Sequence, residues 1–124
     1  ITVRMEDERF QNPQMQIPAV PVEDIIELAE ASPELSIICL NMNRNETISA
    51  KEYGNISFDI AFVDWFKPID DLMEHVPPER VLFGSNSPLF VTRAAVMKVT
   101  YADVEDSVKN SIFTLNAERL INIK

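Results

Sequence analysis

The sequence predicts an α/β fold built from four consecutive strand–helix units, which is half the number in a (βα)8 barrel. Short apolar runs bounded by Gly, Pro or Asn are typical of strands that are buried on both faces of a parallel sheet. Helix-forming segments separate these runs, and the connections are long enough for the crossovers that parallel strands require. The strand starts recur at intervals of roughly 20 to 35 residues, which is close to the spacing in a βα barrel.

The first unit begins with a strand over residues 1–5, where apolar and polar side chains alternate. Residues 12–21 contain three prolines, so this segment is predicted to be a long irregular loop. Such a loop after a strand either contributes to function or covers the mouth of the barrel. A helix is predicted over residues 21–31, and Ser32-Pro33 ends it.

The second and third units follow the same order. A strand over residues 35–40 precedes a short helix over residues 47–53, which Gly54 closes. A strand over residues 56–63 then precedes a helix over residues 68–75. The predicted buried stripe of this helix consists of Ile69, Leu72 and Met73.

The fourth unit begins with a strand over residues 81–83, stopped by Gly84 and followed by a polar turn. Residues 91–99 are apolar, and the sequence leaves open whether they form a helix or a loop packed on the rim. Thr100, with Asp103 in capping-box position, is predicted to cap a final helix, and residues 116–121 close the chain. The apolar residues at helical spacing in this last part are Val104, Val108, Ile112 and Leu115.

Composition narrows the class of protein. The 124 residues form one predicted domain, and their formal charge of −9 disfavours nucleic acid or an anionic membrane as a partner. No apolar run approaches the ~20 residues of a membrane span, so we expect a cytoplasmic protein. One His cannot build a His-rich zinc site, and Cys39, inside an apolar run, is predicted to be an inert buried thiol.

Two motifs near the end of the chain carry a family resemblance. Residues 80–88, Arg-Val-Leu-Phe-Gly-Ser-Asn-Ser-Pro, resemble the strand-eight signature of the amidohydrolase superfamily, Arg-(Leu/Val)-Leu-Phe-Gly-Ser-Asp-x-Pro. Residues 111–120 resemble the closing helix of that family, which ends in Asn-Ala-x-Arg-Leu, and residues 33–41 resemble the run that leads into strand six. The resemblance implies strands five to eight of a TIM barrel, and a metal-dependent hydrolase or lyase acting beside a carboxylate.

The resemblance also implies a metal site, and the residues at its positions are altered. Working family members hold a divalent metal, usually zinc, with a His-x-His pair on strand one, a His on strand five and an Asp on strand eight. A further His on strand six faces the substrate. These positions fall at or next to Arg4, at Asn41 and at Asn86. A guanidinium cannot ligate a metal, and an amide brings no charge and cannot act as a general base. We therefore predict no metal ligand here and leave the cofactor open.

Several polar residues are candidates for a site at the strand ends. Asn41 and Asn86 occupy the catalytic positions in substituted form, while Arg4, Glu6, Ser85 and Trp65 are predicted to contact substrate. Each has an alternative: a local turn for the amides, an internal carboxylate partner for Arg4, and core packing for Trp65. The acidic run 6–8 could hold a hard cation such as Mg²⁺, but consecutive residues rarely converge on one ion.

Two functions from different classes follow. The chain is either a divergent enzyme with a rebuilt site or a catalytically silent homologue that binds a small molecule or a partner. Because the chain starts within a strand, and four strands would leave two open sheet edges, we expect a fragment of a longer barrel. The expected partner is the missing amino-terminal half or a second copy, and the expected ligand is a small-molecule carboxylate.

Overall fold

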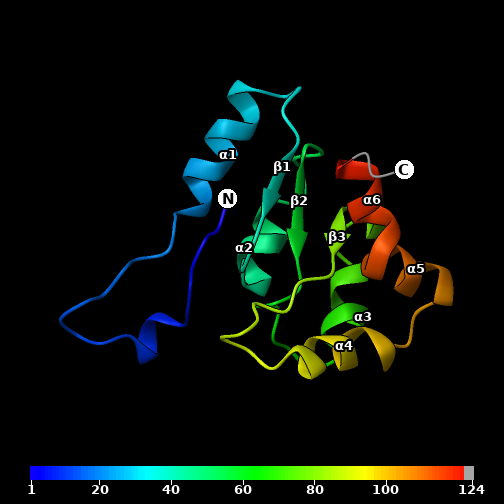
Figure 1. Cartoon of the computed structure of the whole chain (residues 1–124). Coiled ribbons are helices and arrows are strands. Elements are labelled where there is room, and N and C mark those ends of the chain that lie inside the picture. The colour runs from blue at the N-terminus through cyan, green and yellow to red at the C-terminus, as the bar shows by residue number, and fades with distance from the viewer. Residues whose placement is uncertain (122–124) are drawn as a thin grey trace.

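The computed structural model describes residues 1–121 and contains a three-stranded parallel sheet. Its strands β1 (Ile37–Cys39), β2 (Ile56–Asp59) and β3 (Val81–Leu82) lie side by side in sequence order (Figure 1). The amino-terminal segment adds to β1 through a parallel bridge between Thr2 and Leu40. Four chain segments are therefore parallel neighbours in sequence order, as consecutive units of a βα barrel are. The predicted parallel arrangement is confirmed, although the strand over residues 1–5 is reduced to a single bridge.

Within the described residues, six α-helices, two 3-10 turns and one π-helical turn connect and follow these strands. The two 3-10 turns are Glu8–Phe10 and Pro78–Arg80, and a π-helical turn, Ser111–Leu115, joins the last two helices into one continuous rod. The α-helices are α1 (Val22–Ala31), α2 (Arg44–Ser49), α3 (Pro68–Met73), α4 (Thr92–Thr100), α5 (Asp106–Asn110) and α6 (Asn116–Ile121). None of the helices within residues 1–121 is long and apolar enough to cross a lipid bilayer.

The hydrophobic core lies between one face of the sheet and the helices. Alternate strand residues enter it because side chains of a strand point to opposite faces in turn. The strand side chains in this core are Ile37, Cys39, Ile56, Phe58 and Val81, and the helical ones include Ile25, Ile69, Leu72, Val99 and Ile112. The predicted burial of Cys39 is confirmed, and this burial raises the pKa of its thiol to about 11.

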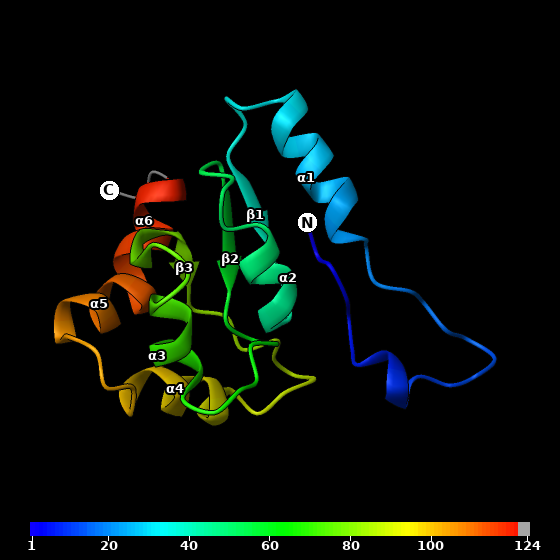
Figure 2. The same ribbon diagram turned by 180° about the vertical axis from the view of Figure 1, so that it is seen from behind.

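The carboxyl ends of the strands lie at the same end of the sheet, where the loops that follow them and α4 gather (Figure 1). The segment between the amino-terminal bridge and α1 extends away from the sheet, and the reverse view shows this loop standing apart from the helices (Figure 2). Its residues 12–21, which the sequence predicted to be irregular, contain no helix or strand, and the 3-10 turn Glu8–Phe10 precedes them.

Some boundaries differ from the prediction. The prediction that Thr100 caps the last helix is wrong, because Thr100 ends α4 and its hydroxyl donates to Val96 O (2.9 Å). The following helix, α5, instead takes Glu105 as its N-cap. The helix α2 begins at Arg44, earlier than predicted, because a capping box starts it. Leu115 is exposed although its spacing predicted burial, since the π-helical turn changes the helical phase.

Candidate functional site

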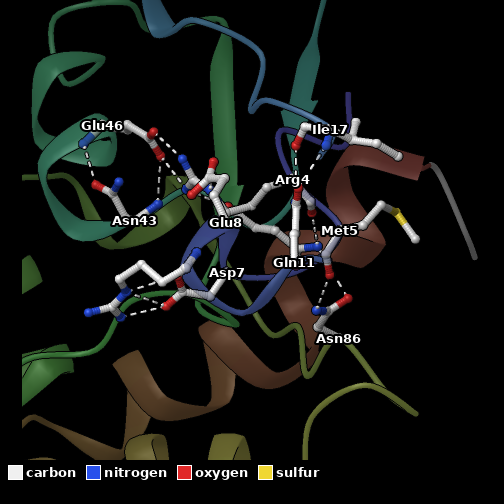
Figure 3. A network of polar contacts seen from close by, with 11 residues as sticks. Arg4, Met5, Asp7, Glu8, Gln11, Ile17, Asn43, Glu46 and Asn86 are labelled. Atoms are coloured by element: carbon white, nitrogen blue, oxygen red, sulfur yellow. Dashed lines mark hydrogen bonds and ion pairs between the residues drawn. The ribbon is translucent and has the colours of Figure 1, made fainter. Parts of the chain in front are cut away.

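The residues at the three family positions lie in contact at the carboxyl ends of the strands. Asn41 follows β1 and Asn86 follows β3, and both have left-handed backbone conformations (φ of 63° and 50°), which Asn tolerates better than most residues. The Asn41 side-chain amide donates to Arg4 O (2.7 Å) and to Asn86 Oδ1 (3.2 Å). The Asn86 amide in turn donates to Met5 O (3.2 Å; Figure 3). We call Arg4, Asn41 and Asn86 the amide–guanidinium cluster.

The Arg4 guanidinium is buried and is bound by side-chain and backbone groups of distant segments of the chain. It forms a bidentate ion pair with Glu46, in which Nη1 lies 2.7 Å from Oε2. It also donates to Asn41 O (3.1 Å) and lies 3.5 Å from Glu8 Oε1, while its Cζ lies 5.7 Å from the centroid of the Phe62 ring. The bonds from Glu46 raise the pKa of Arg4 above its usual value. The internal carboxylate pairing weighed from the sequence is the arrangement present.

Glu46 was not singled out from the sequence, although a signal for it existed. Asn43 and Glu46 have the spacing of a capping box, and both bonds of that box form: Asn43 Oδ1 accepts from Glu46 N (3.0 Å), and Glu46 Oε2 accepts from Asn43 N (2.8 Å). The cap fixes the Glu46 carboxylate at the amino-terminal end of α2. From there the same carboxylate reaches Arg4, so the start of α2 positions the cluster.

Asp59 is a buried carboxyl group at the end of β2, directly beside the cluster. Its Oδ1 accepts a hydrogen bond from Asn41 N (2.8 Å), and burial raises its pKa above the ordinary value of 3.8. Gly84, after β3, packs against this carboxyl group: a Cβ atom at position 84 would lie 2.2 Å from Asp59 Oδ2. The glycine of the strand-eight motif therefore leaves room for Asp59.

A groove made of three adjoining hollows borders the cluster, and Asp64 lines all three. We call these hollows together the mouth groove. The first, about 350 Å³, is mostly apolar, and Ser85 and Lys98 supply polar groups. The second, about 340 Å³, is lined by Arg4, and the third, about 400 Å³, by Glu6. The apolar and aromatic side chains of the groove are Phe10, Ala61, Phe62, Leu89, Phe90, Val91, Ala94 and Ala95.

Lys98 is a charged groove residue that was not predicted from the sequence, because it lies in the segment 91–99, whose structure the sequence left open. Its ammonium group donates to Ile60 O and Ala61 O (both 3.2 Å) and lies 2.7 Å from Asp64 Oδ1. The Lys98 side chain is largely buried, whereas the Asp64 side chain is 75% exposed. The ammonium group is thus held in place by backbone carbonyls, and its carboxylate partner is on the solvent side.

The predicted substrate contacts divide into two groups. Ser85, Arg4 and Glu6 line the mouth groove, but Trp65 lies outside it. Trp65 is exposed, and the guanidinium of Arg44 stacks 4.8 Å from its ring centroid. Asn41 and Asn86 lie beside the groove and do not line it, since their side chains bond to each other and to the backbone.

The donor atoms of the cluster do not fit a divalent metal ion. The guanidinium is cationic, and the two amide nitrogens are committed as donors. Over residues 1–121, no group of three or more His, Cys, Asp or Glu side chains is placed to hold a metal. The acidic run 6–8 does not converge either, because Asp7 pairs with Arg9 and Glu8 turns toward Arg4.

Comparisons with known proteins found a matching family and a similar solved structure. Residues 10–123 match the protein family described as amidohydrolase. Among solved structures, the chain is similar to the crystal structure of 5-carboxyvanillate decarboxylase from Sphingomonas paucimobilis, with a TM-score of 0.62 and 20% sequence identity. The similarity covers 78% of this chain but only 36% of the decarboxylase chain. A comparison with curated proteins found no match.

Proposed function

The chain belongs to the amidohydrolase family, and we propose that it is a metal-free member of that family which binds a small carboxylate in the mouth groove. The observation that carries this proposal is the amide–guanidinium cluster. At the positions where the family resemblance places metal ligands and a substrate-facing His, the side chains bond to one another, to Glu46 and to the backbone. A site of this kind offers no anionic ligand with which to activate a metal-bound water.

The proposed ligand follows from the first hollow of the groove. Its walls are apolar, and the Lys98 ammonium is fixed there by two backbone carbonyls. Because the Asp64 side chain is 75% exposed, it can turn into solvent and leave its place on Lys98 to the carboxylate of a ligand. The Ser85 side chain lines the same hollow and can add a hydrogen bond. Arg4 and Arg9 are weaker candidates for this role. Arg4 already pairs with Glu46 and Glu8, and Arg9 already pairs with Asp7.

We also propose that this chain is the carboxyl-terminal half of a (βα)8 barrel, with strands five to eight. Four parallel segments in sequence order, and a structural relative of which only 36% is covered, support this proposal. The remaining strands would come from an amino-terminal half or from a second copy. We further propose that the protein is located in the cytoplasm.

A second candidate function is a divergent hydrolase or lyase with a rebuilt site. Asp59 favours it, because a buried carboxyl group with a raised pKa at the end of a barrel strand is suited to donate or accept a proton. The structural relative is a decarboxylase, and a decarboxylase is a lyase. Asp59, however, lines none of the three hollows of the mouth groove, so it would need a ligand to enter past Asn41 and Gly84.

Titration of the chain with benzoate, followed by calorimetry or by amide chemical shifts, tests the carboxylate proposal. The variant Lys98→Gln should abolish binding, and Asp64→Asn should strengthen it about five-fold or more, because a competing carboxylate is removed. The matched controls Lys109→Gln and Asp106→Asn make the same charge changes at a pair outside the groove, in which Lys109 is half-buried and Asp106 is exposed, and should leave the affinity unchanged.

Equal benzoate affinity in Lys98→Gln and the wild type, or no tightening in Asp64→Asn, would overturn the ligand proposal. The metal-free part has its own test, which is elemental analysis after dialysis without chelator and again after metal is added back. Near-stoichiometric zinc, manganese or iron would contradict it and would favour the rebuilt-enzyme alternative. Less than about a tenth of an equivalent supports it, since the cluster has no anionic donor among its three members.

A further inference from the structure

The Lys98 ammonium offers a single bond to a ligand in the first hollow of the mouth groove. An ammonium group has three N–H donors, and two of them are committed to Ile60 O and Ala61 O (both 3.2 Å). The remaining donor serves Asp64 Oδ1, which lies 2.7 Å away. A carboxylate that enters this hollow must therefore take the place of Asp64, and it gains no further bond from Lys98.

Exchange of one carboxylate for another on Lys98 is by itself close to neutral in free energy. An ion pair with an exposed partner contributes little, and the pair that the ligand forms replaces the pair that Asp64 loses. The displaced Asp64 carboxylate stays near the ligand, because Asp64 also lines the second and third hollows. The exchange becomes favourable when the ligand itself brings a cation for Asp64.

The charge of the groove also favours a ligand that carries both signs. Within residues 1–121, the charged side chains that line it are the carboxylates Glu6, Asp7, Glu8 and Asp64 and the cations Arg4, Arg9 and Lys98. Carboxylates are thus in excess, and the whole chain has a formal charge of −9. A simple carboxylate adds a negative charge to this groove, whereas a zwitterion adds none.

Apolar side chains extend from the first hollow into the third. Leu89 and Phe90 line both hollows, so an apolar group that runs from Lys98 toward the third hollow keeps contact with these two residues. The Phe90 ring packs against Phe62, with ring centroids 4.7 Å apart. The first hollow, about 350 Å³, has the size of a pocket for a small ligand. The groove therefore fits a small molecule with two opposite charges and an apolar side chain.

The residues of this site belong to neighbouring units of the chain. Asp64 follows β2, Leu89 and Phe90 follow β3, and Lys98 is part of α4. Ligand sites of βα barrels lie at the carboxyl ends of the strands. Further strands that complete the barrel therefore leave these residues at its mouth.

We propose that the ligand of the mouth groove is a free α-amino acid with an apolar side chain. Its carboxylate replaces Asp64 on Lys98, and its ammonium group binds the displaced Asp64 carboxylate. These two groups of an α-amino acid are about 2.5 Å apart, so Asp64 has to withdraw only a short distance, which its exposed side chain permits. The proposal rests on the proposed function, because it names the class of carboxylate that binds there.

Calorimetric titration of the chain at pH 7 with two matched ligands tests this proposal. L-phenylalanine has both charged groups, and 3-phenylpropanoate has the same carbon skeleton and carboxylate without the ammonium group. L-phenylalanine should bind about five-fold more tightly, because only this ligand gives Asp64 a cation in place of Lys98. Equal affinities, or tighter binding of 3-phenylpropanoate, would overturn the proposal.

The variant Asp64→Asn locates the ammonium group of the ligand. Binding of 3-phenylpropanoate should tighten in this variant, as that of benzoate should, because a competing carboxylate is removed. For L-phenylalanine the same change also removes the partner of the ammonium group, so its five-fold preference should fall to about one. The control Asp106→Asn removes a carboxylate outside the groove and should keep the preference. A preference that persists in Asp64→Asn would contradict the proposal, because the ammonium group would then bind elsewhere.

These titrations separate a failure of the amino-acid assignment from a failure of the proposed function. If benzoate and 3-phenylpropanoate bind and L-phenylalanine binds no more tightly than 3-phenylpropanoate, the groove is a carboxylate site and only the amino-acid assignment is lost. If none of the three ligands binds, both proposals are overturned.

Discussion

Replacing Glu46 with Gln should destabilise the chain by about 3 kcal/mol, because it leaves the buried charge of Arg4 with only the longer contact to the half-exposed Glu8 carboxylate (3.5 Å). The structure supports this size of effect: the Arg4 side chain is 7% exposed and that of Glu46 18% exposed, and they form two parallel bonds. Breaking a fully buried ion pair costs roughly 3–5 kcal/mol, and the partial exposure of Glu46 places the expectation at the lower end. The loss is a large share of the roughly 5–15 kcal/mol by which domains are stable.

Urea unfolding followed by circular dichroism measures this effect. With a slope of about 2 kcal/mol per M, the midpoint of Glu46→Gln should fall by about 1.5 M, while the slope itself should not change. The matched control is Glu52→Gln, which alters the same residue type in an exposed pair at 3.9 Å and should stay within about 0.5 kcal/mol of wild type. A double variant with Arg4→Met should lose about 2 kcal/mol less than the sum of the single losses.

A Glu46→Gln protein as stable as the Glu52→Gln control would refute the argument that the amide–guanidinium cluster depends on this pair. Strict additivity in the double variant would do the same, because it would mean that Arg4 and Glu46 contribute independently. Either result would leave the start of α2 as an ordinary capped helix, with no part in positioning Arg4.

Two further predictions concern the buried carboxyl group of Asp59. Burial raises the pKa of Asp59, so the folded chain holds the carboxyl proton more tightly than the unfolded chain does. The stability that Asp59 contributes is therefore fully present below its ordinary pKa of 3.8. It is lost as the pH rises through the higher pKa of the folded state. Urea unfolding of wild type and Asp59→Asn from pH 3.5 to 7 should show wild type losing stability relative to the variant as pH rises, and parallel curves would contradict this. The second prediction is that Gly84→Ala lowers the free energy of unfolding by about 1–3 kcal/mol, because the added Cβ would overlap Asp59. The control Gly54→Ala, which has no atom within 4 Å of the added Cβ, should be neutral or slightly stabilising. Equal thermal midpoints for the two variants would rule out the tight contact.

The sequence predicted the architecture well because burial on both faces of a parallel sheet produces recognisable apolar runs. Strands β1, β2 and β3 all fall within the predicted ranges, and α1 and α3 nearly match theirs. The ends were less predictable, since they depend on contacts from distant parts of the chain. β2 ends at Asp59 rather than at residue 63, because the chain turns there and Val63 N–H donates to Ile60 O (3.3 Å).

The candidate site was predictable in its location but not in its contacts. Position after a strand placed Arg4, Asn41 and Asn86 together, and the structure does bring them into contact. No local pattern could show that the partner of Arg4 is Glu46, 42 positions away, or that Lys98 reaches two carbonyls after β2. Such pairings are set by tertiary packing, which spacing along the chain does not encode.

The two family motifs illustrate why a resemblance alone does not assign a role to each residue. Arg80 opens the strand-eight motif, yet it is buried and donates to Ile56 O (2.6 Å) and Ala50 O (3.0 Å), and burial lowers the pKa of its guanidinium. Asn116, in the closing-helix motif, donates to Pro78 O, which precedes β3, and to Val81 O, in the first residue of β3. Both residues therefore hold β3 in place and contact no hollow of the mouth groove.

Asn86 differs from the Asp of the strand-eight motif that the sequence resembles, whereas Arg80, Gly84 and Asn116 match their motifs and have structural partners. Loss of a metal ligand would free its neighbours to move, unless other bonds replaced the metal as a cross-link between strand ends. Here Asn86 accepts from Asn41 and donates to Met5 O, so it links the end of β3 to the two preceding strand ends that carry Arg4 and Asn41. If the chain is metal-free, as we propose, these bonds of the cluster take the place of a shared metal as the cross-link between the strand ends.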